Sequence, residues 1–124
     1  MEPDARAPSS HTDIRLRLRI LRDGQVAIGP GKVALLEAIR DSGSISAAAR
    51  HLGMSYRRAW LLIDELNGAL IHPATASDTG GKQGGGSSLT AVGAEIIAQY
   101  RSVEHKALEV CADELSRLEA LIRS

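Results

Sequence analysis

The chain has 124 residues, enough for one domain with a single hydrophobic core and too few for two. Apolar residues make up 44% of it, but Phe is absent and only one Trp and two Tyr occur, so Leu, Ile, Val and Ala must fill the core. That composition suits packed helices. No apolar run approaches the ~20 residues of a membrane span. A single Cys, Cys111, excludes an internal disulfide.

These features predict a soluble, cytoplasmic protein with no membrane partner. The N-terminal residues "MEPDARAPSSHT" contain acids and prolines but no apolar segment, so they do not form a signal peptide. Lys and Arg, 15 in all, balance 15 Asp and Glu, yet the charges are unevenly spread. Residues 1–60 carry ten basic and six acidic side chains, and residues 61–124 carry five and nine. A local basic surface is therefore compatible with zero net charge.

The N-terminal region predicts a disordered arm over residues 1–12 and a β-hairpin after it. From Ile14 to Ile20 apolar residues alternate with Arg15, Arg17 and Arg19, the pattern of a half-buried strand. Asp23-Gly24 favours a two-residue hairpin turn. Val26 and Ile28 then predict a second short strand with these two side chains facing inward.

Three helices are predicted next. The first follows Pro30-Gly31, places Val33, Leu36, Ala38 or Ile39 on its inner face, and ends at Gly43. Ser44 caps the second helix, which buries Ile45, Ala48, Ala49 and Leu52 and ends at Gly53. Ser55 caps the third, which runs to about Leu70. Its predicted inner residues are Ala59, Trp60, Ile63, Leu66 and Asn67, and its predicted outer residues are Arg57, Arg58, Leu61 and Leu62.

Residues 71–89 predict a glycine-rich hairpin, and Thr90 begins a last helix that runs to Arg123. An apolar stripe continues along that helix for about seven turns, longer than one small domain needs to cover. We therefore expect the helix to pair with its own copy in a homodimer. The predicted dimer residues are Ile96, Tyr100, Val103, Ala107, Cys111, Leu115, Leu118 and Ile122.

This order of elements is that of a winged helix-turn-helix, mainly α with a small β component, occupying residues 13–124. The helix-turn-helix covers about residues 44–70, the wing about 71–89 and the C-terminal dimerisation helix about 90–123. In this fold the third helix enters the DNA major groove N-terminus first, which brings Ser55, Tyr56, Arg57 and Arg58 to double-stranded DNA. An arginine fork matches guanine O6 and N7, and serine hydroxyls bind phosphate. A random Arg-Arg pair is more often a solvated helix face, but two arginines beside a positive helix end favour an external anion here.

Several assignments stay open at this point. Tyr56 suits either core packing or a base contact. Leu61 and Leu62 suit thymine methyl groups or packing beneath the wing. The loop "TGGKQGGGSS" lacks the GK[ST] order of a nucleotide-binding loop, so a wing tip with Lys82 near DNA phosphate is the better interpretation. Scattered histidines form no catalytic or metal-ligating group, so we expect neither an enzyme nor a metal site.

Two sequence strings resemble the N-terminal DNA-binding domain of the ModE family of molybdate-responsive transcriptional regulators, which are distantly similar to LysR-type winged helices. One is "SGSISAAARHLGMSYRRAW" followed by "IDELN", and the other is "TGGKQGGGSSLTAVGAEII". The similarity runs from about Leu16 to Tyr100. It implies a homodimer that binds a palindromic operator near genes of molybdate uptake or of molybdoenzymes. The matching DNA-contact residues are Ser46, Ser55, Tyr56, Arg57 and Arg58, to which we add Arg50 on the preceding helix.

The resemblance has two departures. Full-length ModE proteins carry C-terminal oxyanion-binding domains, and because this chain ends at Ser124 we expect that sensing domain to be missing. No cofactor is expected in the chain, and the resemblance assigns molybdate no site here. The first wing strand reads "PATAS" where the family is more apolar, which predicts a poorly ordered wing. The leading hypothesis is a dimeric repressor, and the alternative is a winged-helix adaptor that binds a partner protein through Leu61 and Leu62 and does not bind DNA specifically.

Overall fold

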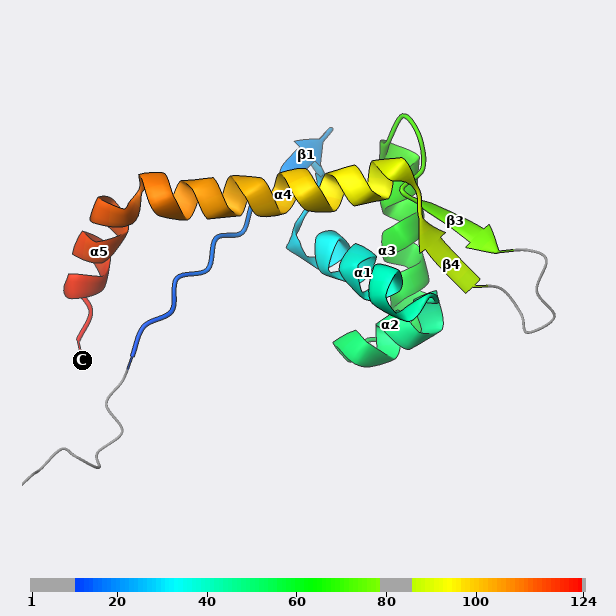
Figure 1. Ribbon diagram of the computed structural model, residues 1–124, viewed down its shortest axis with the longest axis horizontal. Helices are drawn as coiled ribbons and strands as arrows, with labels where there is room; N and C mark the ends of the chain where they lie inside the picture. Colours follow the sequence, from blue (N-terminus) through cyan, green and yellow to red (C-terminus); the bar gives the residue numbers. More distant parts are fainter. Residues whose placement is uncertain (1–10, 79–85, 124) are drawn as a thin grey trace, which may run out of the picture. The chain divides into compact units, whose positions relative to one another are not determined.

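The computed structural model describes residues 11–78 and 86–123. The chain forms two compact units, one of residues 17–102 and one that contains the two chain ends. The elements are mainly helical with two small antiparallel sheets, as the sequence predicted (Figure 1). In chain order they are β1 (Ile20–Arg22), β2 (Gln25–Ile28), α1 (Pro30–Ser42), α2 (Ile45–Leu52), α3 (Tyr56–Ala69), β3 (Thr75–Asp78), β4 (Gly86–Leu89), α4 (Ala91–Val110) and α5 (Ala112–Ala120).

Strands β1 and β2 form the predicted hairpin. Asp23 and Gly24 have φ angles of 52° and 79°, the two positive values that a type I′ turn requires. The longer strand predicted from Ile14 to Ile20 is wrong, because only Ile20–Arg22 pair with β2. Since β2 ends at Ile28 and α1 begins at Pro30, the residues before Ile20 have no strand opposite them. Ile14 and Ile20, predicted to face inward, are exposed, whereas Leu16 and Leu18 are partly covered.

Helix α2 begins and ends where the sequence indicated, and α1 ends at Gly43 as predicted but begins at Pro30, two residues earlier than expected. Pro30 lies in the first turn of α1, where its missing N–H costs nothing, and Gly43 ends the helix with a φ of 83°. At the start of α2 the Ala47 N–H donates to Ser44 Oγ at 3.0 Å. Gly53 ends α2 in the same left-handed conformation, with a φ of 70°.

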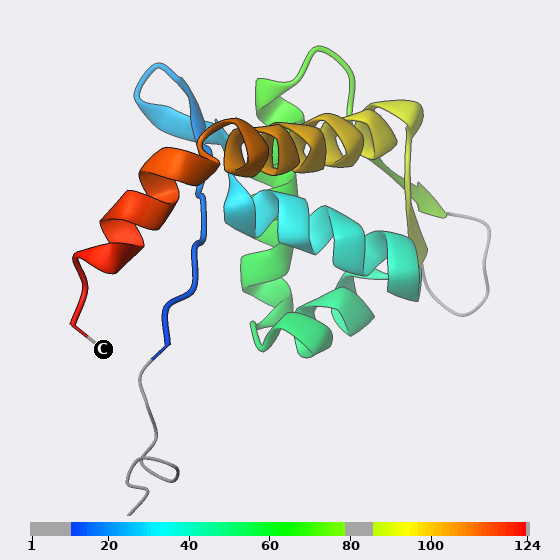
Figure 2. The same ribbon diagram turned by 60° about the vertical axis from the view of Figure 1, so that its left-hand side comes forward.

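The core lies between α1, α2 and α3, which Figure 2 shows packed around one another. Five of its side chains have no exposed surface and are the largest fully buried ones: Val33, Leu35, Leu36, Ile39 and Leu66. Alanines at the helix contacts, Ala48, Ala49 and Ala59, are also buried, so the helices approach closely. The predictions of the inner and outer faces of α3 are each wrong at one residue. Trp60, expected inside, is 46% exposed, and Leu62, expected outside, packs against the core. The buried stripe of α3 runs through Ala59, Ile63 and Leu66, and Trp60 points about a quarter of a turn away from it.

The wing strands are tied to the helices by hydrogen bonds of the buried Ala74 peptide. Its N–H donates to Asn67 Oδ1 on α3 at 2.8 Å, and its carbonyl accepts from the Thr90 N–H at 2.9 Å. Thr90 also begins α4 as predicted, since the Gly93 N–H donates to Thr90 Oγ1 at 3.2 Å. On the other side of the wing, the Ser87 N–H of β4 donates to the Gly43 carbonyl at 2.9 Å. The base of the wing is therefore fixed to α1, α3 and α4.

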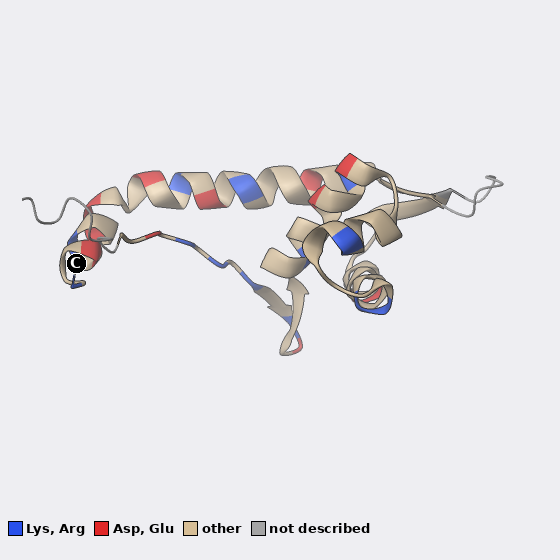
Figure 3. Cartoon of the chain, turned by 90° about the horizontal axis from the view of Figure 1, so that it is seen from below, with Lys and Arg blue, Asp and Glu red and all other residues tan. Residues whose placement is uncertain are grey.

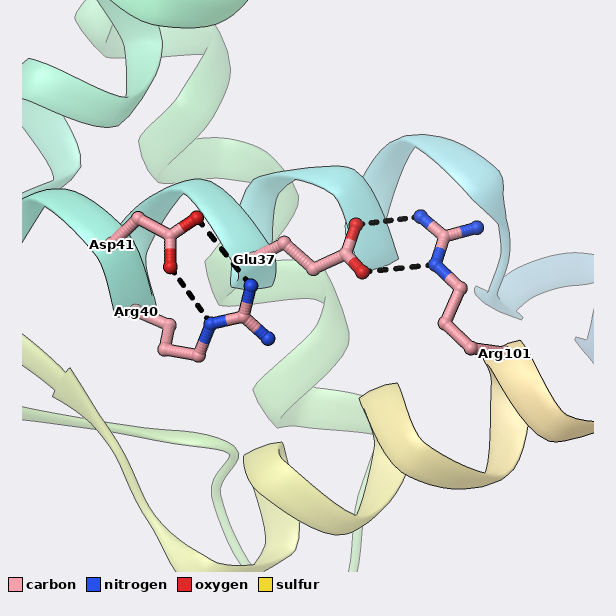
Figure 4. A network of polar contacts seen from close by, with 4 residues as sticks. All are labelled: Glu37, Arg40, Asp41 and Arg101. Carbon is pink, nitrogen blue, oxygen red and sulfur yellow. Dashed lines mark hydrogen bonds and ion pairs between the residues drawn. The ribbon is translucent and has the colours of Figure 1, made fainter.

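A second link joins α1 to α4 through a bidentate ion pair. Arg101 Nη2 and Nε donate to the two carboxylate oxygens of Glu37 at 2.6 and 2.9 Å (Figure 4). The hydrogen bonds from Arg101 lower the pKa of Glu37, and its desolvation offsets this only in part. Nearby on α1, hydrogen bonding to Arg40 lowers the pKa of Asp41. Beside Arg101, Tyr100 is buried and its hydroxyl donates to the Leu18 carbonyl at 2.8 Å.

The C-terminal helix is interrupted, in contrast to the single helix predicted from Thr90 to Arg123. Helix α4 ends at Val110 and α5 begins at Ala112, with Cys111 between them at φ −98° and ψ 16°. Neither Gly nor Pro marks this position, so nothing in the sequence signalled the interruption. In the unit formed by the chain ends, Thr12 Oγ1 donates to Glu119 Oε2 at 2.5 Å.

Gly93→Ala is expected to destabilise the protein by roughly 1 to 3 kcal/mol. The added Cβ would overlap the Ala74 carbonyl oxygen, a backbone atom that its own hydrogen bond holds in place. Thermal unfolding followed by circular dichroism measures the effect. Gly68→Ala is the matched control, because a Cβ there meets nothing within 4 Å and alanine favours the helix. Equal melting temperatures for the Gly93 variant and the parent would contradict this account of the wing base.

Glu37→Gln is expected to lower the free energy of unfolding by about 0.5 to 1 kcal/mol at neutral pH, a value discounted for the partial exposure of Arg101. Because the pKa of Glu37 is lowered in the folded state, the pair stabilises the protein above the ordinary glutamate pKa, and its contribution is lost as the pH falls through the lowered value. Urea unfolding at a series of pH values should therefore show the variant and the parent converging at acidic pH. Glu95→Gln is the control for the loss of a carboxylate at an exposed position of α4.

Candidate nucleic-acid interface

The turn between α2 and α3 sets how the start of α3 is presented. Gly53 adopts a left-handed conformation, and the Met54 N–H donates to the Ala49 carbonyl at 3.0 Å, so the chain reverses within a few residues. Ser55 then caps α3, its Oγ accepting from the Arg58 N–H at 3.1 Å. The first turn of α3 contains no acidic residue. This terminus therefore presents backbone N–H groups and basic side chains without a negative charge beside them.

Arg57 and Arg58 are both exposed on the first turn of α3. Neither forms an ion pair or a side-chain hydrogen bond with any residue that the structure describes. Other basic residues of the same unit are engaged, since Arg40 pairs with Asp41 and Arg101 with Glu37. The two arginines thus hold guanidinium groups in solvent that are available to an anionic partner.

The exposed face of α3 changes its charge along the helix. Basic residues occupy the first turn, whereas Asp64 and Glu65 are exposed in the second half. Glu65 Oε1 lies 3.5 Å from Lys32 Nζ, which offsets one of these two negative charges. A polyanion would be attracted to the N-terminal half and repelled by Asp64 farther along. This gradient makes the N-terminal half of the exposed α3 face the better contact for an anionic partner.

Exposed aromatic and apolar side chains accompany the arginines. Tyr56 is 58% exposed, so it is not a core residue, and the base contact stays a prediction. Trp60 lies one turn later on the same side of α3 and is also exposed, although the sequence analysis assigned it to the core. Leu61 is 38% exposed beside it. The helical period places Trp60 at the edge of the buried stripe, so the sequence alone did not identify it as a surface residue.

The other predicted DNA contacts of the described residues are also on the surface. Ser46 and Arg50 are exposed on α2, and Arg50 has no ion-pair partner among the described residues. Ser55 is exposed as well. Its oxygen is occupied by the cap, but its O–H can still donate to a phosphate. The predicted contact Lys82 and most of the predicted wing tip lie outside the described residues, while β3 and β4 pair in register from Thr75↔Leu89 to Asp78↔Gly86.

The predicted dimer stripe divides into an inner and an outer part. Tyr100 is 3% exposed within the single chain and Ile96 packs against the core, so neither offers a free apolar surface. Ala107 and Leu115 are partly covered. The remaining members of the stripe are exposed: Val103, Cys111, Leu118 and Ile122. Other large apolar side chains of this region, Val110 and Leu121, are more than four-fifths exposed.

The described residues hold no group of three or more His, Cys, Asp or Glu side chains that could bind a metal ion. Within the same parts of the chain, none of the helices combines the length and the hydropathy needed to cross a bilayer.

The chain is similar to several curated proteins whose names refer to molybdenum or to ModE. The molybdenum-pterin-binding protein MopB of Rhodobacter capsulatus is 47% identical over 77 residues, 62% of this chain and 28% of that protein. The molybdenum transport protein ModE of Azotobacter vinelandii is 40% identical over 88 residues, 71% of this chain and 33% of its own length. The DNA-binding transcriptional dual regulator ModE of Escherichia coli is 40% identical over 88 residues, 68% of this chain and 34% of its own. This chain thus spans about a third of these relatives, and no protein-family model matches it.

Proposed function

Because this chain is a relative of the ModE-type regulators, as its two sequence strings predicted, we propose that it is a sequence-specific DNA-binding regulator of transcription. In this proposal it acts in the cytoplasm as a dimeric repressor, at genes of molybdate uptake or of molybdoenzymes. It binds double-stranded DNA and catalyses no reaction. The observation that carries the proposal is the pair of exposed, unpaired arginines at the capped start of the second helix of a helix-turn-helix.

The proposed mode of binding follows from the chemistry of that helix end. The N-terminus of α3 enters the major groove, where Arg57 and Arg58 reach guanine O6 and N7 or the flanking phosphates. Tyr56 and Trp60 supply apolar surface against the sugar and thymine methyl groups. Ser46, Arg50 and Ser55 bind the phosphate backbone and fix the position of the helix. Lys82 at the wing tip adds a further phosphate contact.

Homodimer formation is the second part of the proposal. The exposed apolar side chains of the C-terminal region include Val103, Leu118 and Ile122, and a second copy of the chain would cover them. A two-fold dimer presents two copies of α3 to a palindromic operator. Operator symmetry and protein symmetry then match.

Arg57→Ala and Arg58→Ala are each expected to weaken specific DNA binding by roughly 1 to 3 kcal/mol. The loss arises from the missing base or phosphate contact, and a lost phosphate contact also lowers the salt dependence of binding by about one unit of slope. Preferred duplexes are selected from a random pool with the parent protein. Fluorescence anisotropy with the selected and scrambled duplexes at two salt concentrations then gives the affinities.

Arg40→Ala is the matched control, since it removes a positive charge from α1 at a side chain already paired with Asp41. A double Arg57→Ala, Arg58→Ala variant that melts like the parent and binds as tightly would disprove the assigned contacts. Molybdate is a second variable, because the names of the relatives refer to molybdenum. An affinity that changes with molybdate would place an effector site in this chain, and a constant affinity would not.

Leu118→Glu combined with Ile122→Glu is expected to convert the dimer to a monomer, because burying two carboxylates at an apolar contact is unfavourable. Sedimentation equilibrium measures the mass directly. Ser116→Glu adds one negative charge at an exposed polar position of α5 and should leave the dimer intact. A parent that sediments as a monomer at high micromolar concentration would refute this part of the proposal.

One specific observation favours the alternative function, that of a protein-interaction adaptor. Trp60 and Leu61 are both partly exposed on α3 and extend the apolar surface next to Tyr56. Leu62, the other residue of the predicted patch, is partly buried against the core and adds less to this surface. Selection from the random duplex pool separates the two functions, because an adaptor would enrich no sequence.

A further inference from the structure

A cavity of about 610 Å³ lies away from the start of α3, where the β1–β2 hairpin meets the beginning of α1 and the end of α3. Its wall contains residues from the segment before β1, from the hairpin turn, and from the last two turns of α3. All of these belong to the unit of residues 17–102. The volume falls within the range of about 300 to 1,000 Å³ typical of sites for small organic ligands.

The cavity wall has an excess of positive charge that the described residues do not neutralise. Arg17, Arg19 and Arg22 line it, and none of them forms an ion pair with a described residue. Figure 3 shows the basic positions recurring along the segment that leads into the hairpin, with an acidic position at the hairpin turn. That acidic residue is Asp23, so the three arginines exceed their only uncompensated acidic neighbour by two charges.

The remaining charged pair of the wall is already satisfied. Lys32 is 6% exposed, and its Nζ donates to the Val26 carbonyl at 2.6 Å and lies 3.5 Å from Glu65 Oε1. Lys32 therefore fixes the wall rather than binding a ligand. The first turn of α1, which borders the cavity, contains no acidic residue.

The wall also has an apolar part. Val26, Leu62 and Ala69 contribute side chains to it, and Pro30 adds a rigid ring. Space and apolar surface of this kind exceed what a bare inorganic anion needs, whereas an organic body can fill them. Planar guanidinium groups match the oxygen geometry of a phosphate better than any other side chain.

We propose that this cavity binds a small organic molecule that carries a phosphate group. Arg17, Arg19 and Arg22 bind the phosphate, and the organic part lies against Val26 and Leu62. Since Leu62 and Glu65 belong to α3, the ligand would contact the helix that carries Arg57 and Arg58. Binding itself does not depend on the proposed function. Only its consequence, control of DNA affinity by a phosphorylated metabolite, rests on that function.

Isothermal titration calorimetry without DNA tests the site, with the full chain in a buffer free of phosphate. The probes are glucose 6-phosphate, adenosine monophosphate and phosphoenolpyruvate, compared with glucose, adenosine, pyruvate and inorganic phosphate. We expect at least one organic phosphate to bind saturably and more tightly than inorganic phosphate and its own dephosphorylated form. Arg17→Gln combined with Arg19→Gln should weaken that binding by about tenfold or more, because charge-assisted hydrogen bonds are lost.

Arg15→Gln is the matched control on the same segment, since Arg15 pairs with Asp13 and does not line the cavity. It should bind the organic phosphate like the parent. If the double variant melts at a lower temperature than the parent, the single change Arg22→Gln on the hairpin replaces it. No saturable binding of any of the three organic phosphates, or unchanged affinity in a folded arginine variant, overturns the proposal.

Two further outcomes also decide against it. Equal affinity for inorganic phosphate would show that the apolar wall has no part in binding. Loss of DNA affinity in the arginine variants, without any small-molecule binding, would assign these arginines to the DNA backbone. A failure of the DNA-binding proposal leaves the calorimetric result untouched, so the two failures are distinguishable.

Discussion

The position of the wing relative to α3 depends on the buried Ala74 peptide. Its N–H is held by the Asn67 amide on α3, its carbonyl by the Thr90 N–H, and the backbone of Gly93 on α4 lies against that carbonyl. A buried peptide group must have both hydrogen bonds made, so the chain has one low-energy position at this point. Because the same residue precedes β3, the wing starts from a point fixed to the helix that carries Arg57 and Arg58.

The division of charge along α3 explains how a protein of zero net charge can present a basic surface. Basic residues that support the fold are paired with acids, as Arg101 with Glu37 and Lys32 with Glu65. Arg57 and Arg58 lie beside the positive end of the helix dipole, and neither pairs with an acid in the described part of the chain. Pairing, rather than total charge, therefore determines where an anion is attracted.

The sequence predicted correctly those features in which one residue type strongly favours one local backbone conformation. Asp23-Gly24 gave the type I′ turn, Gly43 and Gly53 the left-handed helix ends, and Ser44 and Ser55 the caps. These features depend on the backbone conformation of a few neighbouring residues. The caps fix where each helix begins, and with the start known the helical period shows which positions face solvent. All the proposed contacts on α2 and at the start of α3 are exposed.

Features that depend on distant partners were not predictable in the same way. The alternation from Ile14 to Ile20 is that of a strand, but a strand also needs a neighbour, and β2 is too short to supply one. Trp60 lies at the edge of the helical stripe, and only the packing of the other helices decides that the buried face is formed by Ala59, Ile63 and Leu66 without it. The cavity beside α3 could not be predicted from the sequence either, because its wall combines arginines near residue 20 with residues near 65.

Different parts of the α3 surface therefore have different surroundings. Ala59, Ile63 and Leu66 hold it in the core, its first turn carries the unpaired arginines, and its last two turns form one wall of the cavity. A ligand that binds one orientation of α3 more tightly than another would shift the protein toward that orientation by its difference in affinity and no more. Because Leu62 and Glu65 line the cavity and belong to the helix that begins with Arg57 and Arg58, a ligand there would act on an anionic partner only through such a difference between orientations of α3.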